Sequence, residues 1–181
     1  MKQTTLIILT VLFCFGCSDK FDLEKPDTNQ FVLQLKNGTY NEFHLGENGE
    51  KLWTIFPKLS MKDIPILLKL ADDTTIIYPC NHFPTNPISS IPPFRTNEKG
   101  DVKGIMLAEY LLWSVETIIN NGNYPSMTPL LRQSKETQWL VGLTGKDILT
   151  VREKYFNWWN EYGKNGNISV SPLSGTVYRW R

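Results

Sequence analysis

Four side chains in this sequence are of types that carry nucleophilic or acid–base chemistry and have a suitable partner nearby. Cys80 and His82 are two positions apart, and Glu109 and Glu116 lie on either side of Trp113. An imidazolium stabilises a neighbouring thiolate, which is the nucleophile of cysteine hydrolases. Two carboxylates beside an aromatic ring are typical of enzymes that cleave sugars. These residues are the candidate catalytic groups of a hydrolase acting on glycan or peptide.

The spacing of both pairs argues against catalysis. Residues two apart in an extended segment point to opposite faces, so the side chains of Cys80 and His82 diverge there. Glu109 and Glu116 would stand about two turns, near 10 Å, apart along one helix, which is too far for a retaining glycosidase. The simpler interpretation is that Cys80 is buried, as a lone cysteine usually is. The two glutamates then lie on a solvated helix face, or Trp113 packs under another element.

Four aromatic residues at helical spacing form a possible binding site: Tyr155, Trp158, Trp159 and Tyr162. Their rings could make a platform on which a carbohydrate stacks. The same spacing fits a helix face packed into the core, because aromatic side chains carry large apolar surfaces. Both interpretations stay open from the sequence.

Charge and ligand spacing exclude several classes of partner. The formal net charge is +1, so the chain has no basic footprint for nucleic acid. His44, His82 and Cys80 lack the spacing of zinc ligands, which come in sets of three or four. We therefore expect no nucleic acid, no metal and no cofactor.

The N-terminal segment resembles the signal of a bacterial lipoprotein. Lys2 precedes a short apolar run, Leu6–Phe15, and then Gly16-Cys17. This pattern is typical of a secretory signal, and the run is shorter than the roughly 20 apolar residues of a membrane-spanning helix. Gly16-Cys17 resembles the lipobox, although Cys14 stands where the lipobox has Leu. The resemblance implies that Cys17 is lipidated and begins the mature chain; the alternative is an ordinary secretory signal.

Length and composition indicate one domain. The chain has 181 residues, of which 41% are hydrophobic, and this is enough to bury a core. We expect residues 1–16 to be a lipoprotein signal peptide, 17–28 a tether, and 29–181 a single globular domain.

Hydrophobic periodicity predicts a mainly α fold, either a compact bundle or a short solenoid-like domain. We expect four or five helices around the strongest one, Val102–Asn121. Asn29–Lys36, capped by Asp27 or Thr28, and Ile148–Tyr162, preceded by a capping box at Thr144, are two others. The predicted core is Phe31, Leu35, Ile64, Leu67, Leu68, Leu111, Leu112, Val115, Ile118, Ile148, Val151, Tyr155 and Trp159.

Three other segments have irregular or extended character. Thr74–Lys99 holds five prolines and several large apolar residues, so we expect an ordered Pro-rich loop on the functional surface, or one that only covers the core. Phe43–Leu45 and Leu52–Phe56 flank a Gly-rich turn, which suits a small hairpin or an ordered loop. Ile168–Arg181 fits a short terminal strand.

Seven short sequence motifs are spread along the chain from residue 63 to residue 175. They are Asp63-Ile64-Pro65, Ala71-Asp72-Asp73-Thr74-Thr75, Asn86-Pro87-Ile88-Ser89-Ser90, Leu111-Leu112-Trp113-Ser114-Val115-Glu116, Tyr124-Pro125-Ser126, Asn157-Trp158-Trp159 and Pro172-Leu173-Ser174-Gly175. They resemble a family of short Bacteroides-type lipoproteins with a domain of unknown function. The resemblance covers most of the mature chain and implies a self-contained domain in the cell envelope of a Gram-negative anaerobe. It implies no activity and no catalytic residue.

These observations together predict a lipid-anchored protein of the Gram-negative cell envelope, placed at the outer membrane. We expect a non-enzymatic binding or interaction module, attached to the membrane through its N-terminal lipid, whose partner is an envelope protein or a glycan. The alternative is an envelope hydrolase that uses Cys80 with His82, or Glu109 with Glu116.

Overall fold

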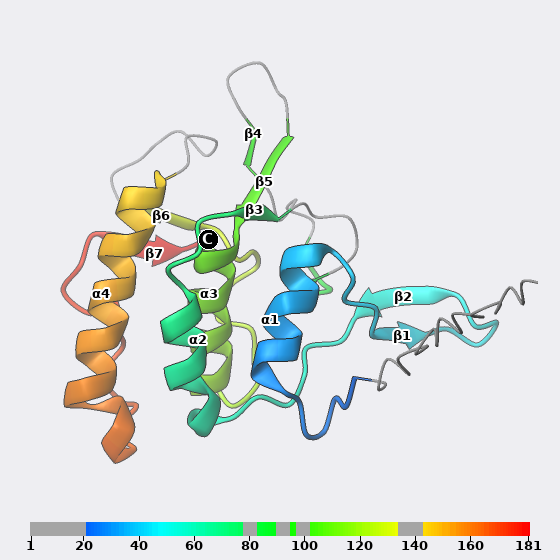
Figure 1. Ribbon diagram of the computed structural model, residues 1–181, viewed down its shortest axis with the longest axis horizontal. Helices are drawn as coiled ribbons and strands as arrows, with labels where there is room; N and C mark the ends of the chain where they lie inside the picture. Colours follow the sequence, from blue (N-terminus) through cyan, green and yellow to red (C-terminus); the bar gives the residue numbers. More distant parts are fainter. Residues whose placement is uncertain (1–20, 78–82, 90–94, 97–101, 134–142) are drawn as a thin grey trace, which may run out of the picture.

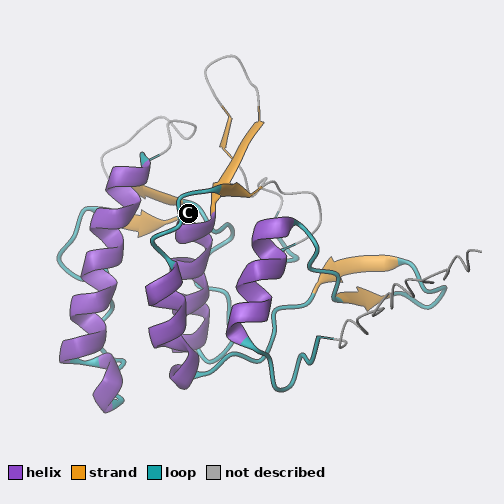
Figure 2. Ribbon diagram, viewed as in Figure 1, coloured by secondary structure: helices purple, strands orange, loops and turns teal. Residues whose placement is uncertain are grey.

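The structure is a computed structural model that describes residues 21–77, 83–89, 95–96, 102–133 and 143–181. These residues form a mixed α/β fold with four α-helices and three small antiparallel sheets (Figures 1 and 2). The prediction of a mainly α bundle or solenoid is therefore wrong. The strands are only two to five residues long and several pair with distant segments, so no local periodicity marks them.

The helices stand side by side, with α4 at one end of the row and α1 towards the other (Figure 1). Helix α2 packs against α3, and α1 and α4 both contact α2. None of the helices in the described ranges is long and apolar enough to cross a membrane. The helical elements are α1 (Thr28–Asn37), α2 (Ile64–Leu70), α3 (Leu107–Ile119) and α4 (Gly145–Glu161), with 3-10 turns η1 (Met61–Asp63) and η2 (Gly163–Asn165).

The strands form three separate sheets. The first is a local hairpin, the second joins strands from either side of the Pro-rich segment, and the third joins segments that α4 separates in the sequence. The hairpin pairs β1 (Phe43–Leu45) with β2 (Lys51–Thr54); the three-stranded sheet has β5 (Val102–Met106) between β3 (Ile76–Ile77) and β4 (Arg95–Thr96); the third pairs β6 (Leu131–Gln133) with β7 (Tyr178–Trp180).

Side-chain caps define the ends of two helices that the sequence predicted. The Asp27 carboxylate accepts hydrogen bonds from the backbone N–H groups of Asn29 and Gln30 at the start of α1, and Gly38 ends that helix with a φ of 64°. At α4, the Asp147 carboxylate accepts from the Thr144 N–H and hydroxyl in a capping box. Such caps satisfy backbone groups that the helix itself leaves unpaired.

The strongest predicted helix begins later than its periodicity suggested. Residues Val102–Met106 form β5, and α3 starts only at Leu107. Gly104 explains the difference, because its φ of 68° is incompatible with a right-handed helix. A Cβ at this position would also collide with the carbonyl oxygen of Ile77 on β3. The close approach of the two strands thus requires glycine.

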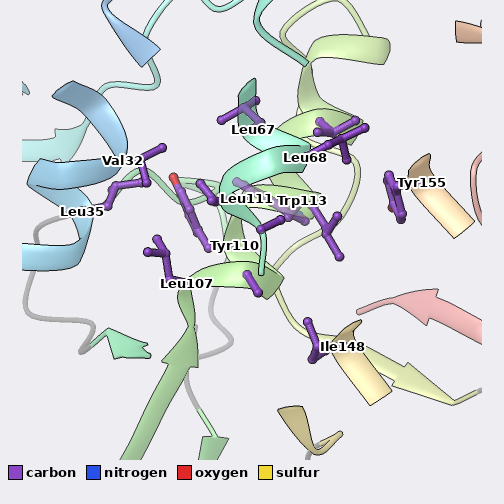
Figure 3. Packing of buried hydrophobic residues seen from close by; sticks show 14 of the residues in the cluster. Val32, Leu35, Leu67, Leu68, Leu107, Tyr110, Leu111, Trp113, Ile148 and Tyr155 are labelled. Carbon is purple, nitrogen blue, oxygen red and sulfur yellow. The ribbon is translucent and has the colours of Figure 1, made fainter. Parts of the chain in front are cut away.

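Helix α3 is the centre of the core, and all of its residues are buried (Figure 3). Its hydroxyl groups are satisfied within the helix, since Ser114 donates to the Tyr110 carbonyl and Thr117 to the Trp113 carbonyl. The predicted core residues are all buried except Trp159, which is partly buried at the margin.

The folded part of the chain includes residues that precede α1. Phe21 is only 5% exposed, and its ring meets the Tyr40 ring edge-on with centroids 5.5 Å apart. The backbone carbonyl of Leu23 accepts a hydrogen bond from the Lys58 N–H. Among the described residues, packing against the domain thus includes Phe21, which lies ahead of residue 29.

Candidate functional site

The two glutamates of α3 lie inside the protein. Glu109 and Glu116 are both buried, since α3 is covered on every side. The interpretation that they occupy a solvated helix face is therefore wrong. Large apolar residues surround the full circumference of α3. Hydrophobic periodicity predicts burial of one helix face only, so it underestimated the burial of this helix.

Glu109 holds the start of β6. Its Oε1 atom accepts a hydrogen bond of 2.6 Å from the backbone N–H of Leu131, the first residue of that strand. A carboxylate oxygen is a strong acceptor for a backbone amide in a buried setting. The contact connects the first turn of α3 to the C-terminal sheet, where β6 pairs with β7.

Glu116 connects α3 to α4 and to β7. Its Oε1 atom accepts a 2.7 Å hydrogen bond from the Tyr155 hydroxyl, which in turn accepts one of 3.0 Å from the Trp180 indole N–H. We call these three residues the Glu116 network. Burial raises the pKa of Glu116 above its usual range, while the hydrogen bonds from Tyr155 and Trp180 act in the opposite direction. Burial also raises the pKa of Tyr155, with further contributions from the neighbouring Glu116, so this hydroxyl stays protonated and donates.

Trp113 is not available as a sugar-binding ring beside the two glutamates. It is fully buried and stacks on Tyr124 with ring centroids 5.1 Å apart and an interplanar angle of 16°. Its indole N–H donates to the Ser126 hydroxyl at 2.8 Å, and that hydroxyl donates to the Thr128 carbonyl. Trp113 thus packs under the segment that follows α3, which was one of the two expectations from the sequence.

The aromatic residues of α4 divide into two pairs. Tyr155 is fully buried, and Trp158 is 3% exposed with its indole N–H donating to the Val170 carbonyl. Trp159 and Tyr162 are only partly buried. The four rings therefore do not form one open platform. Of these four rings, only Trp159 and Tyr162 keep appreciable exposed surface on which a ligand could stack, and we call this pair at the end of α4 the α4 aromatic edge.

Three of the residues singled out from the sequence lie outside the described ranges. These are the predicted lipidation site Cys17 and the proposed catalytic pair Cys80 and His82. Much of the Pro-rich loop lies outside them too, so its order along the whole of Thr74–Lys99 stays a prediction. Within the described part of the chain, no three His, Cys, Asp or Glu side chains come together in a way that could hold a metal ion.

One exposed surface was not identified as a possible site from the sequence. On the β1–β2 hairpin, the side chains of Leu45, Leu52 and Trp53 are 63%, 48% and 43% exposed. The hairpin projects from the helical layer at the end of the molecule opposite α4 (Figure 1). The signal that could have revealed it is the apolar Leu52-Trp53 pair placed in a short strand of a local hairpin, which has too few neighbours to cover both faces.

The fold and its buried carboxylates define a small mixed α/β domain whose core includes hydrogen-bonded glutamates. The model of the family described as domain of unknown function DUF4943 matches residues 22–181, and the chain belongs to this family. The sequence-based expectation of a family of unknown function is thus confirmed. No curated protein and no solved structure was found to match the chain.

Proposed function

We propose that the protein is a lipid-anchored component of the Gram-negative cell envelope, at the outer membrane, and that it acts as a binding or interaction module without catalysis. The observation that carries this proposal is the lipobox-like Gly16-Cys17 junction, which stands four positions before Phe21, a residue of the core. Acylation of Cys17 would hold the folded domain directly at the membrane surface.

The short distance between anchor and domain supports this arrangement. A fully extended chain covers at most about 3.5 Å per residue, so Cys17 lies within about 14 Å of Phe21. The resemblance to bacterial lipoproteins implies three acyl chains, and more than one chain is what stable anchoring requires.

The use made of the two glutamates favours binding over catalysis. A general acid or base must come within hydrogen-bond reach of the substrate. Glu109 instead binds a backbone N–H of β6, and Glu116 binds the Tyr155 hydroxyl in the interior. Both carboxylates therefore serve to join α3 to its neighbours. We assign the binding of an envelope protein or a glycan to the α4 aromatic edge, Trp159 and Tyr162. Partly buried aromatic rings suit either partner.

The anchor is tested by metabolic labelling of the full-length protein with an alkyne fatty acid. We expect labelling of the wild type and of Cys80→Ala, which serves as the matched control, and loss of labelling in Cys17→Ala. Labelling that persists in Cys17→Ala, or a wild type that carries no label, would contradict the proposal.

The binding surface is tested by placing a photo-crosslinking amino acid at Tyr162 in cells that express the acylated protein. The control position is Leu149, which is exposed on the same helix. We expect adducts from position 162 that are absent from position 149. Equal adduct patterns from the two positions would remove the α4 aromatic edge as the binding surface.

A further inference from the structure

We propose that the β1–β2 hairpin is a second membrane contact, which lies in the lipid–water interface beside the acylated N-terminus. This inference rests on the lipid anchor proposed above and adds the surface of the domain that faces the bilayer. It places the hairpin end of the molecule against the membrane and the α4 end away from it (Figure 1).

The hairpin exposes apolar side chains on both of its faces. Cross-strand pairing places Leu45 opposite Lys51, so these two side chains share one face. Successive residues of β1 alternate, which puts His44 on the other face. The register of the ladder shifts between Phe43 and Leu45, so alternation is interrupted in β2, and the Trp53 ring contacts the His44 ring with centroids 4.8 Å apart. Among the residues that the structure describes, no helix covers either face in the way that α2 and α4 cover α3.

The chain enters the domain at the base of this hairpin. Phe21 packs against Tyr40, and the Tyr40 hydroxyl donates a 2.7 Å hydrogen bond to the Ile55 carbonyl. Tyr40 precedes β1 and Ile55 follows β2, so both belong to the hairpin base. A lipid on Cys17 lies within about 14 Å of Phe21, while the hairpin itself extends about 20 Å from its base to its turn. The anchor thus brings the hairpin within reach of the bilayer.

The side chains of the hairpin have the chemistry of an interfacial element. Tryptophan is enriched at membrane–water interfaces because its ring is apolar and its N–H is polar. Lys51 has its ammonium group 4.4 Å from the centre of the Phe43 ring, and its alkyl stem can lie along apolar surface while the charge reaches water. Leu45 and Leu52 supply aliphatic surface that water would otherwise cover.

The charges of the turn indicate which lipid surface suits the hairpin. Glu47 and Glu50 lie in the exposed turn, and Lys51 follows them as a single cation. Carboxylates are repelled by an anionic bilayer. We therefore infer a zwitterionic surface, with the strands lying along the interface and the turn carboxylates in the headgroup water.

The test uses the mature acylated protein in zwitterionic phosphatidylcholine vesicles, with Cys80→Ser as background. A nitroxide is attached to Leu45→Cys or Leu52→Cys, and in a matched control to Leu149→Cys on α4. Electron paramagnetic resonance power saturation then compares the accessibility of each nitroxide to oxygen, which concentrates in lipid, and to an aqueous nickel complex. We expect the oxygen-to-nickel ratio at positions 45 and 52 to rise severalfold on vesicles, with no change at position 149.

Two nitroxide results would overturn the inference, and a separate measurement tests the anchor on which it rests. Nitroxides at 45 and 52 that stay as accessible to nickel as position 149 would show a hairpin in water. A loss of nickel access without a gain in oxygen access would show a protein contact instead of a lipid one. Mass spectrometry of the same sample separates these cases from the failure of the anchor, because a chain without acyl groups on Cys17 contradicts the proposed function as well.

Discussion

The two ends of the molecule use their side chains in opposite ways. At the α4 end, ionisable and polar groups are buried, and the Glu116 network joins α3, α4 and β7. At the other end, the β1–β2 hairpin exposes leucine and tryptophan. Two of the candidate catalytic residues, Glu109 and Glu116, thus hold the fold together, and the hairpin presents the apolar surface. Burial, more than residue type, decides which side chains are available to a partner.

The largest expected effect comes from disrupting the buried core around α3. Trp113→Ala removes a fully buried indole, its stacking on Tyr124 and its hydrogen bond to Ser126. We expect the free energy of unfolding to fall by about 3–5 kcal/mol, as for other buried aromatic residues. Urea denaturation followed by circular dichroism measures it. Trp113→Phe, which keeps an aromatic ring, should lose less; a loss below about 1 kcal/mol in Trp113→Ala would contradict the tight packing of the core around α3.

A second prediction concerns the pH dependence of stability at the α4 end, where Glu116 binds Tyr155. Because burial raises the folded-state pKa of Glu116, the folded protein holds this proton above the ordinary carboxyl pKa of 4.5, where the unfolded chain releases it. The contribution of Glu116 to stability is therefore complete below 4.5 and is lost as pH rises through the folded-state pKa. Glu116→Gln removes this dependence, so its stability relative to wild type should improve from pH 4 to pH 8.

The pH prediction is measured by urea denaturation at a series of pH values. Glu153→Gln is the matched control, since Glu153 is exposed on α4. Parallel stability profiles for wild type and Glu116→Gln would mean that Glu116 titrates like a solvated carboxyl. The burial of a carboxyl group would then no longer distinguish the α4 end from the hairpin end.

The smallest expected effect is at the hairpin. Trp53→Ala truncates a side chain that is 43% exposed and contacts His44. We expect a change in unfolding free energy within about 0.5 kcal/mol, as is usual for surface positions. The same urea denaturation checks it. If Trp53→Ala cost as much as Trp113→Ala, the hairpin would be part of the core and its exposed surface would need another explanation.

Local signals in the sequence predicted the caps of α1 and α4. The Asp27 cap and Gly38 of α1, and the capping box of Thr144 and Asp147 at α4, depend on residues within three or four positions of each other. The hairpin of Phe43–Leu45 and the extended C-terminal segment were also among the expectations, and β7 occupies Tyr178–Trp180.

Long-range contacts account for what the sequence did not predict. The sequence predicted Val102–Met106 as the start of a helix, whereas pairing with β3 and β4 and the left-handed backbone at Gly104 make it a strand. Glu109 and Glu116 look exposed on a helical wheel, because the groups that donate hydrogen bonds to them belong to other elements. These donors are the Leu131 N–H and the Tyr155 hydroxyl. The exposure of the hairpin could not be read from the sequence either, since it depends on how the described helices pack, and none of them covers it.

The pairing of β6 with β7 also has a consequence for how the chain assembles. Leu131 pairs with Trp180 across the whole of α4, whereas Phe43 pairs with Thr54 across one turn. Closing a longer loop costs more entropy and slows folding. We therefore expect the hairpin to form early and β7 to dock late, after α4 has packed. Until Trp180 arrives, Tyr155 lacks one of its hydrogen-bond partners, so the final step of folding completes the Glu116 network.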